Sequence, residues 1–385
     1  MTETPVRPQR VHAIDVARAV AIVGVAANHS IDGMLNAGLI PADHPLETVN
    51  SALYLFRMPA LAFLLGLFVP RAVTKRGGPG YVRERASLML YLYLLWYALQ
   101  SAAEAATNGL KNTPRDAGSI WSVWITFAHL WFLPFLIVTS VVLAVSRPWA
   151  SRSRGLVVGV VLLGVSLVTW GWNLDVFGLT GLSLLVFAAA GSMVGLPRLG
   201  ALMQRSVWGW TAVGLLGLAA LLLIDQLDVV PGTLPASADL AQSALSLCAA
   251  VAGTLALLAV SVLLSHVTPL RGLLAAIGRR TLPIYLAHVI VVAGVRVVLL
   301  ALGVDEPYVI VAIAVPLGVA VPFLAAVFAE PRPWANWVFD LPRPWKTWSQ
   351  GGTRTGTSPA LDDTTPTSPD RAHPRHASAP STRFP

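Results

Sequence analysis

The stretch "DVARAVAIVGVAANHS", Asp15 to Ser30, is apolar overall but carries an acid, an arginine and a histidine. An Asp or an Arg costs about 2.5–3.5 kcal/mol at the centre of a membrane-spanning helix. Nine uninterrupted apolar residues separate Arg18 from Asn28, whereas a spanning helix needs roughly 20. If this segment spans a membrane, its polar side chains must lie in the membrane zone with it, either as boundary anchors or as a buried site.

The composition is that of a membrane protein. Of the 385 residues, 55% are hydrophobic and 12% are charged, and the mean hydropathy is +0.66. Ordinary soluble domains carry about 25% charged residues. The single cysteine, Cys248, excludes an intramolecular disulfide framework. No cleavable signal is expected, because no small-residue cleavage site follows the first apolar segment. We therefore predict an all-α, multi-pass protein of the cell membrane.

Apolar segments separated by short polar loops predict about ten transmembrane helices. They lie at roughly residues 12–31, 49–69, 87–107, 120–146, 155–172, 176–195, 206–224, 241–265, 281–301 and 308–329. If the N-terminus is cytoplasmic, the loops on that side collect almost all Lys and Arg, and the opposite loops hold only Lys111 and Arg115. The positive-inside rule then places both termini in the cytoplasm. The pI of about 10.1 reflects this topology, so no nucleic-acid partner is expected.

The composition divides the chain into four parts. Residues 1–11 are a cytoplasmic N-terminal segment, and residues 12–330 are the membrane domain. Residues 331–350 alternate Trp with Pro, Arg and Lys, which is typical of the membrane interface. Residues 351–385 contain almost nothing apolar, so we expect a disordered cytoplasmic tail there.

A polar stripe is predicted along the first helix. Arg18 and His29 are 11 residues apart, which returns them to within about 20° of the same helical face and separates them by about 16 Å along the axis. Asp15 lies one turn before Arg18 on that face. In the alternative interpretation, Asp15 and Arg18 pair as an anchor at the helix start while His29 reaches the outer interface.

Further ionisable residues lie inside later spans. Arg57 is near the middle of the second span, where a structural ion pair with Asp15 or Glu104 is the alternative to a functional role. Exposing an ionisable side chain to lipid costs too much free energy, so such residues face the protein interior. Their distribution over several spans therefore predicts a hydrated cavity lined by protein.

Two more histidines belong to this set. His129 lies in the fourth span and His288 in the ninth, with Tyr285 one turn before His288 and Arg296 deeper in the same span. A lone histidine is more often a satisfied core residue than a catalyst, so a structural role stays open for both. No Cys/His metal spacing and no Gly-rich phosphate loop is found, and no loop is long enough for a soluble catalytic domain.

Five blocks of the sequence resemble, in the same order, those of the acyltransferase-3 family of integral membrane acyltransferases, and the resemblance covers roughly residues 10–330. In the first block, an Arg is followed by ten residues and then by a His. The blocks read "RAVAIVGVAANH", "FRMPALAFLLGLF", "RERASLMLYLYLLW", "HLWFLPFLIV" and "IGRRTLPIYLAHVIVV". Two positions depart from the family pattern: Leu65 stands before Gly66 where the family usually has Ser, and Ala19 follows Arg18 where a Gly is common.

The resemblance implies transfer of an acyl group, commonly acetyl, from cytoplasmic acyl-CoA to a hydroxyl of an extracytoplasmic sugar or glycolipid. A hydroxyl needs a base with a pKa near the working pH, which suits His29 as general base, or less favourably as a transient acyl carrier. Arg18 is expected to assist it, and Arg18 or Arg57 would stabilise the oxyanion or hold the anionic CoA. The expected donor-binding residues are Arg18, Arg57, Tyr285 and His288, and the expected cavity residues are Asp15, His129 and Trp131. No metal is expected.

Two other classes of function remain open from the residues alone. A transporter or flippase for a small polar or lipid-linked substrate would also use buried Arg and His residues. The sequence shows no inverted repeat or paired broken helices of the kind many transporters carry. A non-catalytic scaffold fits less well, because it has no need of buried charge.

Overall fold

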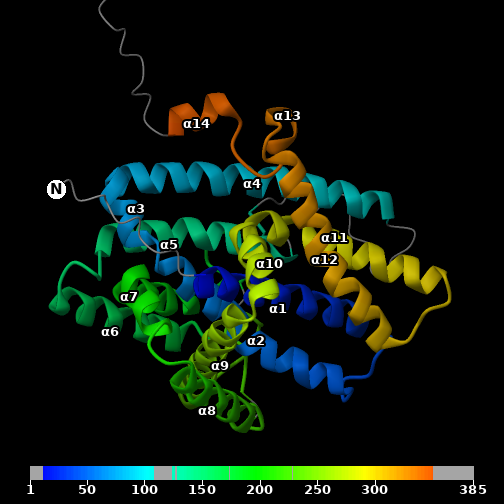
Figure 1. The fold of residues 1–385 in the computed structure, drawn as a ribbon, viewed down its shortest axis with the longest axis horizontal. Coiled ribbons are helices and arrows are strands. Elements are labelled where there is room, and N and C mark those ends of the chain that lie inside the picture. The colour runs from blue at the N-terminus through cyan, green and yellow to red at the C-terminus, as the bar shows by residue number, and fades with distance from the viewer. Residues whose placement is uncertain (1–11, 108–123, 126–127, 173, 228, 350–385) are drawn as a thin grey trace, which may run out of the picture. The chain divides into compact units, whose positions relative to one another are not determined.

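The computed structural model describes residues 12–107, 124–125, 128–172, 174–227 and 229–349 (Figure 1). The described part is helical, apart from an isolated antiparallel bridge between Ile125 and Val176. The described residues belong to one compact unit. The predicted N-terminal segment and C-terminal tail lie outside the described residues.

The described helices account for most of the described chain. In chain order they are α1 (His12–Asn36), α2 (Pro45–Gly66), α3 (Val69–Arg76), α4 (Gly78–Thr107), the 3-10 turn η3 (Ala128–Trp131), α5 (Phe132–Ser146), α6 (Arg152–Val168), the 3-10 turn η4 (Leu182–Leu184), α7 (Leu185–Met203), α8 (Val207–Asp225), α9 (Leu240–His266), α10 (Thr268–Arg279), α11 (Thr281–Ala301), α12 (Pro307–Ala329), α13 (Pro333–Asn336) and α14 (Arg343–Ser349).

Several helices begin at side chains that cap their free backbone N–H groups. Ser151 accepts a hydrogen bond from the N–H of Arg154 at the start of α6, and Ser206 does the same for α8. Asp239 and Gln242 form a reciprocal capping box at the start of α9. These short polar loops therefore mark the ends of the apolar segments in the way the sequence predicts.

Nine helices of the described chain are long and apolar enough to cross a membrane, with α2 and α3 counted together. Each overlaps a predicted span, and the remaining predicted span, 155–172, corresponds to α6. With 17 residues, α6 is at the short end of spanning helices. It runs antiparallel to η4 and α7, because Ser166 donates to the carbonyl of Ser183 while Gly155 lies near Met193.

The parallel direction of α1 and α11 indicates that α6 also crosses the membrane. Arg18 contacts Thr281 near the starts of the two helices, and His29 contacts His288 further along both, so α1 and α11 are parallel. If only the nine longer helices crossed the membrane, α11 would be the eighth crossing and would run opposite to α1. With α6 included it is the ninth, which agrees with the predicted order. Which side faces the cytoplasm stays a prediction.

The sixth predicted span, 176–195, is displaced along the chain. Its helix begins at Leu182 and extends to Met203 with a break in the helical backbone at Gly195. Gly181, just before it, has a φ of 87°, a left-handed conformation that glycine adopts without the steric penalty of a Cβ. The Gly-rich turn before Leu182 therefore stays outside the helix, although apolar residues flank it.

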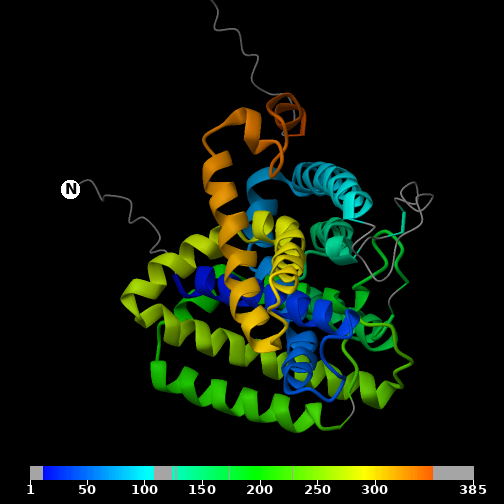
Figure 2. The ribbon, with the colours of Figure 1, turned by 90° about the vertical axis from the view of Figure 1, so that its right-hand side faces the viewer.

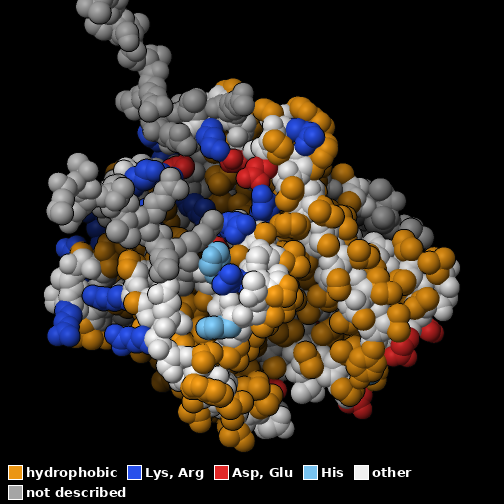
Figure 3. Space-filling view, in the orientation of Figure 1, with side chains coloured by type: hydrophobic (Ala, Val, Ile, Leu, Met, Phe, Trp, Pro, Cys, Tyr) orange, Lys and Arg blue, Asp and Glu red, His pale blue; other side chains and the backbone are white. Residues whose placement is uncertain are grey.

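α1 runs through the middle of the bundle and α8 lies at its edge (Figures 1 and 2). α1 packs against α2, α9, α10, α11 and α12. In its most apolar window 67% of the residues are buried, against 11% for α8. Leucines such as Leu215, Leu216 and Leu223 are exposed on α8, as expected for a lipid-facing surface. Figure 3 shows most Lys and Arg side chains in the left and upper parts of the view, with some acids among them, and further acids at the lower right edge.

The segment after α12 packs along α4 (Figure 1). Tyr91 of α4 donates to the carbonyl of Trp337, and Trp96 donates to that of Val338. Arg83 reaches the carbonyl of Ser349 at the end of α14. The Trp/Pro/Arg segment predicted at 331–350 is thus hydrogen-bonded to the membrane domain.

α2 and α7 cross with their backbones in direct contact. A Cβ on Gly66 would overlap the carbonyl oxygen of Ala188, and a Cβ on Gly191 would overlap that of Phe63. Only glycine allows two helices to approach so closely, as in other membrane bundles. This crossing sets where α2, and with it Arg57, lies relative to the rest of the bundle.

We expect Gly66→Ala to lower the free energy of unfolding by about 1–3 kcal/mol, because the added methyl group forces α2 and α7 apart. Thermal unfolding in detergent measures the effect. Gly164→Ala is the matched control, since a Cβ there meets nothing within 4 Å and the gain in helix propensity is the same. Equal stability of the two variants would contradict the close crossing.

Candidate active site

Three histidines from three separate elements meet inside the bundle. His29 of α1, His129 of η3 and His288 of α11 have ring centroids 5.1–5.7 Å apart. They come from the first, fourth and ninth predicted spans, and the structure brings them into one cluster. In the described part of the chain, no group of three or more His, Cys, Asp or Glu is arranged to hold a metal ion.

The three rings differ in accessibility and in hydrogen bonding. His288 is 0% and His129 is 4% exposed, while His29 is only partly buried. Nδ1 of His288 lies 2.7 Å from the carbonyl oxygen of Tyr285 and 3.1 Å from that of Ile284. Carbonyls only accept, so Nδ1 carries the proton and Nε2 is the basic nitrogen of a neutral ring. His288 is therefore fixed in one tautomer.

His129 is held from two sides. Gln100 of α4 places its Nε2 3.4 Å from Nε2 of His129 and 3.3 Å from the carbonyl oxygen of Leu286. The hydroxyl of Tyr285 donates to the carbonyl oxygen of His129. Tyr285 thus ties η3 to α11, and Gln100 connects α4 to both.

Several buried nitrogens of this region have no hydrogen-bond partner among the described residues. They are Nδ1 of His129, Nε2 of His288 and Nε of Arg57. The ring nitrogens of His29 make no hydrogen bond with a described residue. Buried polar atoms are nearly always satisfied by protein, water or ligand. The unpartnered nitrogens are therefore candidates to bind a water molecule or polar atoms of a substrate, and His29 is the most exposed of the three histidines.

Arg57 is the cation of this region. It is 5% exposed, and its guanidinium carbon lies 4.3 Å from the ring centroid of Tyr54. The Tyr54 hydroxyl donates to Oδ2 of Asp32 at 2.5 Å. Arg57 also interacts electrostatically with His29 and His288. A desolvated cation on an aromatic face is stabilised by the ring quadrupole, so Tyr54 and Asp32 together compensate a buried charge.

The ion pairs considered for Arg57 are not formed within the described residues. Asp15 is directed to the other end of α1, where its Oδ2 lies 3.9 Å from Nη1 of Arg279. The side chain of Glu104 lies outside the described part. Among the described residues, Nε of Arg57 has no hydrogen-bond partner.

A group of polar side chains between the C-terminal half of α1 and the N-terminal half of α2 was not among the predicted site residues. Nδ2 of Asn50 lies 2.8 Å from Oδ1 of Asp32 and 3.0 Å from Oε2 of Glu47. Nδ2 of Asn28 donates to Oδ1 of Asn50 at 2.5 Å. The signal was present in the sequence: Glu47, Asn50, Tyr54 and Arg57 follow one another at the three- and four-residue spacing of one helical face.

Arg18 lies apart from the histidines, at the other end of α1. Its Nη2 donates to the Thr281 hydroxyl at 2.8 Å, and its guanidinium carbon is 5.8 Å from the ring centroid of Phe68. It lines a cavity of about 310 Å³. The other residues lining this cavity are Leu64, Leu65, Phe68, Val69, Ala72, Arg76, Tyr81, Glu84, Arg85 and Leu88. One helix thus carries a cation at one end and an accessible imidazole toward the other.

Trp131 packs away from the three imidazoles. Its ring contacts those of Phe132 and Phe135 and lies against Gly181, between α5 and η4. Among the described ring contacts, none joins Trp131 to a histidine. These contacts indicate that Trp131 packs behind His129 and supports its position.

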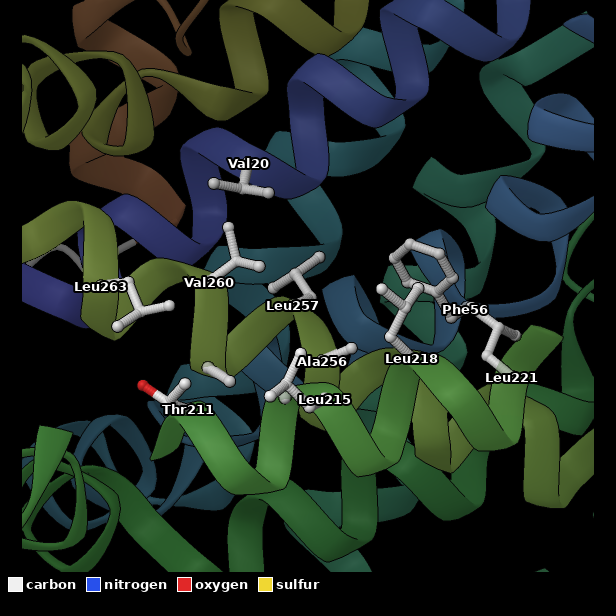
Figure 4. A pocket seen from close by; sticks show the side chains of 12 residues that line it. Val20, Phe56, Thr211, Leu215, Leu218, Leu221, Ala256, Leu257, Val260 and Leu263 are labelled. Atoms are coloured by element: carbon white, nitrogen blue, oxygen red, sulfur yellow. The ribbon is translucent and has the colours of Figure 1, made fainter. Parts of the chain in front are cut away.

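A second cavity, of about 280 Å³, is apolar (Figure 4). Val20 of α1 and Phe56 of α2 line it together with side chains of α8 and α9, and Thr211 supplies the one hydroxyl. No ionisable side chain lines it, so it has no group for acid–base chemistry.

A scan against protein families matches the family described as "Acyltransferase domain" over residues 11–327. Neither the curated proteins nor the solved structures contain a match to the chain. The matched region includes the three histidines, Arg57 and Arg18, and it covers well over half of the sequence. The chain therefore belongs to the acyltransferase-3 family of membrane acyltransferases.

Proposed function

We propose that the protein transfers an acyl group, with acetyl as the first candidate, from cytoplasmic acyl-CoA to a hydroxyl of an extracytoplasmic sugar or glycolipid. The observation that carries this proposal is the cluster of His29, His129 and His288, in which only His29 is partly accessible. The membership of the acyltransferase-3 family supports the reaction class.

In this proposal His29 is the general base. Its neutral ring takes the proton of the acceptor hydroxyl while the oxygen attacks the thioester carbonyl. The resulting tetrahedral intermediate then expels the CoA thiolate, which takes the proton from the His29 imidazolium. The C–S bond breaks, a C–O bond forms, and no proton is gained or lost overall. General bases of this kind contribute about 10²- to 10⁴-fold to rate.

Arg57 is the group best suited to stabilise the oxyanion. It is buried, it carries an unpartnered Nε, and it interacts electrostatically with His29. Donors that are preorganised in a water-poor site stabilise a developing charge more strongly than water does. Tyr54 and Asp32 hold the guanidinium in place and are positioning residues in this scheme.

The donor would enter through the cavity that contains Arg18. Arginine binds phosphate groups through its fork of donors, and the basic side chains of this cavity suit the anionic end of CoA. The acyl-pantetheine arm is long and flexible, so the thioester can reach His29, about 16 Å further along α1.

The test is an assay of purified full-length protein in detergent with radiolabelled acetyl-CoA. We expect slow release of CoA without an acceptor, and transfer of the label when cell-envelope glycans are added. Liposomes containing the protein provide the contrast, because a transporter would move a polar substrate without consuming a thioester. Failure to consume acyl-CoA of any chain length, with transport in liposomes, would overturn the proposal.

A further inference from the structure

The cavity around Arg18 contains an internal ion pair at its edge. Arg76, the last residue of α3, and Glu84, on α4, both line the cavity, and Nε of Arg76 lies 2.5 Å from Oε2 of Glu84. Gly77, with a φ of 73°, makes the turn that brings the two helices together. The side chains are 40% and 25% exposed, so a ligand from solution can reach the pair.

The charges of this cavity are unbalanced. Arg18, Arg76 and Arg85 line it, and Glu84 is the one carboxylate among the lining residues. Glu84 is engaged by Arg76, while Arg85 forms no ion pair with a described residue. The surplus of guanidinium groups makes the cavity a site for an anion with more than one charged oxygen.

We propose that Arg76 and Arg85 form a subsite for the phosphate groups of the acyl donor, and that Glu84 occupies Arg76 until the donor displaces it. This inference rests on the proposed function, because it takes an acyl-CoA as the donor. A phosphate can bind the Arg76 guanidinium through two parallel N–H···O bonds, and it carries more charge than the Glu84 carboxylate. Displacement is feasible, because ion pairs between partly exposed side chains are weak.

The ion pair is not needed to form the turn between α3 and α4. The N–H of Gly77 bonds to the carbonyl of Val73, and the N–H of Tyr81 bonds to that of Gly77. These backbone bonds continue across the turn without either charged side chain. Removal of the Glu84 charge should therefore change ligand binding more than it changes folding.

The experiment compares two donors, acetyl-CoA and acetyl-pantetheine, which carries the same thioester but no phosphate. We expect Glu84→Gln to lower the KM for acetyl-CoA about two- to fivefold, by freeing Arg76 from a weak ion pair. Arg76→Gln should raise that KM about tenfold. Neither variant should change kcat or the KM for acetyl-pantetheine.

Arg280 and Glu330 provide the matched control. They form an ion pair of the same length, 2.5 Å, between α11's N-terminal flank and the end of α12, and neither lines the cavity. Glu330→Gln and Arg280→Gln should leave the KM for both donors unchanged.

Binding measurements separate this inference from the proposed function. Titration calorimetry is done with CoA and with pantetheine, in neutral detergent without phospholipid. Glu84→Gln should bind CoA more tightly than the native protein does, and it should bind pantetheine with unchanged affinity. If CoA binds in this way but no thioester is consumed, the subsite stands and the proposed function fails. An unchanged CoA affinity in Glu84→Gln, or an equal shift for both ligands, would overturn the subsite. If added phosphatidylglycerol competes with CoA, the subsite of Arg76 and Arg85 binds a lipid headgroup, and its assignment to the acyl donor is overturned.

Discussion

Replacement of His29 by Gln is expected to lower the rate of acyl transfer about 10³-fold while the protein remains folded, because general bases contribute about 10²- to 10⁴-fold. Gln keeps a polar side chain of similar length but has no group that accepts a proton near neutral pH. His29 is partly exposed, and its ring makes no hydrogen bond with a described residue. The substitution therefore breaks no hydrogen bond to that part of the protein. The measurement is kcat with acetyl-CoA together with the melting temperature in detergent.

His266→Gln is the matched control for His29→Gln. His266 lies at the end of α9, and its Nδ1 contacts only the carbonyl of Val262 in its own helix. We expect native kcat in this variant. Loss of folded protein in His29→Gln would favour the interpretation of His29 as an interfacial anchor, and a native rate would exclude it as the base.

Replacement of Arg57 by Gln should lower kcat about 10²- to 10³-fold, the effect of removing one oxyanion donor, with little change in the KM for the donor. The reason is that Arg57 is buried within electrostatic range of His29 and has an unpartnered Nε. Arg57 forms no salt bridge with a described carboxylate, and Asp32 keeps its hydrogen bonds to Tyr54 and Asn50 when Arg57 is replaced, so we expect the variant to fold. Arg57→Lys keeps the charge but loses the fork of donors, so we expect partial activity.

Arg296 offers the comparison for Arg57. It is also an intramembrane arginine without an ion pair to a described residue, but its guanidinium packs over Gly33, one turn beyond His29 on α1. Arg296→Gln should retain most of the native kcat. Equal losses in the two variants would show that any arginine in this region supports activity through the general electrostatic field, and Arg57 would lose its specific role.

Much of the secondary structure follows from the sequence because hydropathy is a local property. Inside a bilayer every backbone N–H and C=O must bond within its own helix, so an apolar segment of sufficient length becomes a helix wherever it lies in the fold. The first span is an example: its predicted start at residue 12 is the start of α1. The Gly-rich turn before Leu182 is the counter-example, since apolar composition alone did not reveal that the helix starts later.

The candidate site was predictable only in part. Arg18 and His29 share one helix, so their spacing along α1 follows from helical geometry. The network of Asp32, Asn50 and Tyr54 joins two helices: the spacing on α2 is visible in the sequence, but the pairing with Asp32 depends on how α1 and α2 face each other. The pair of Arg76 and Glu84 required the turn at Gly77.

The sequence by itself determined that the chain is an all-α membrane protein, the order of its spans and the residues that carry charge into them. Tertiary structure alone decided that His129 and His288 lie beside His29, and that Trp131 packs away from them. The reason is physical: residues in different spans meet through the packing of whole helices. Contacts such as that between Gly66 of α2 and Ala188 of α7 set this packing, and no local pattern in the sequence encodes the distance across the bundle.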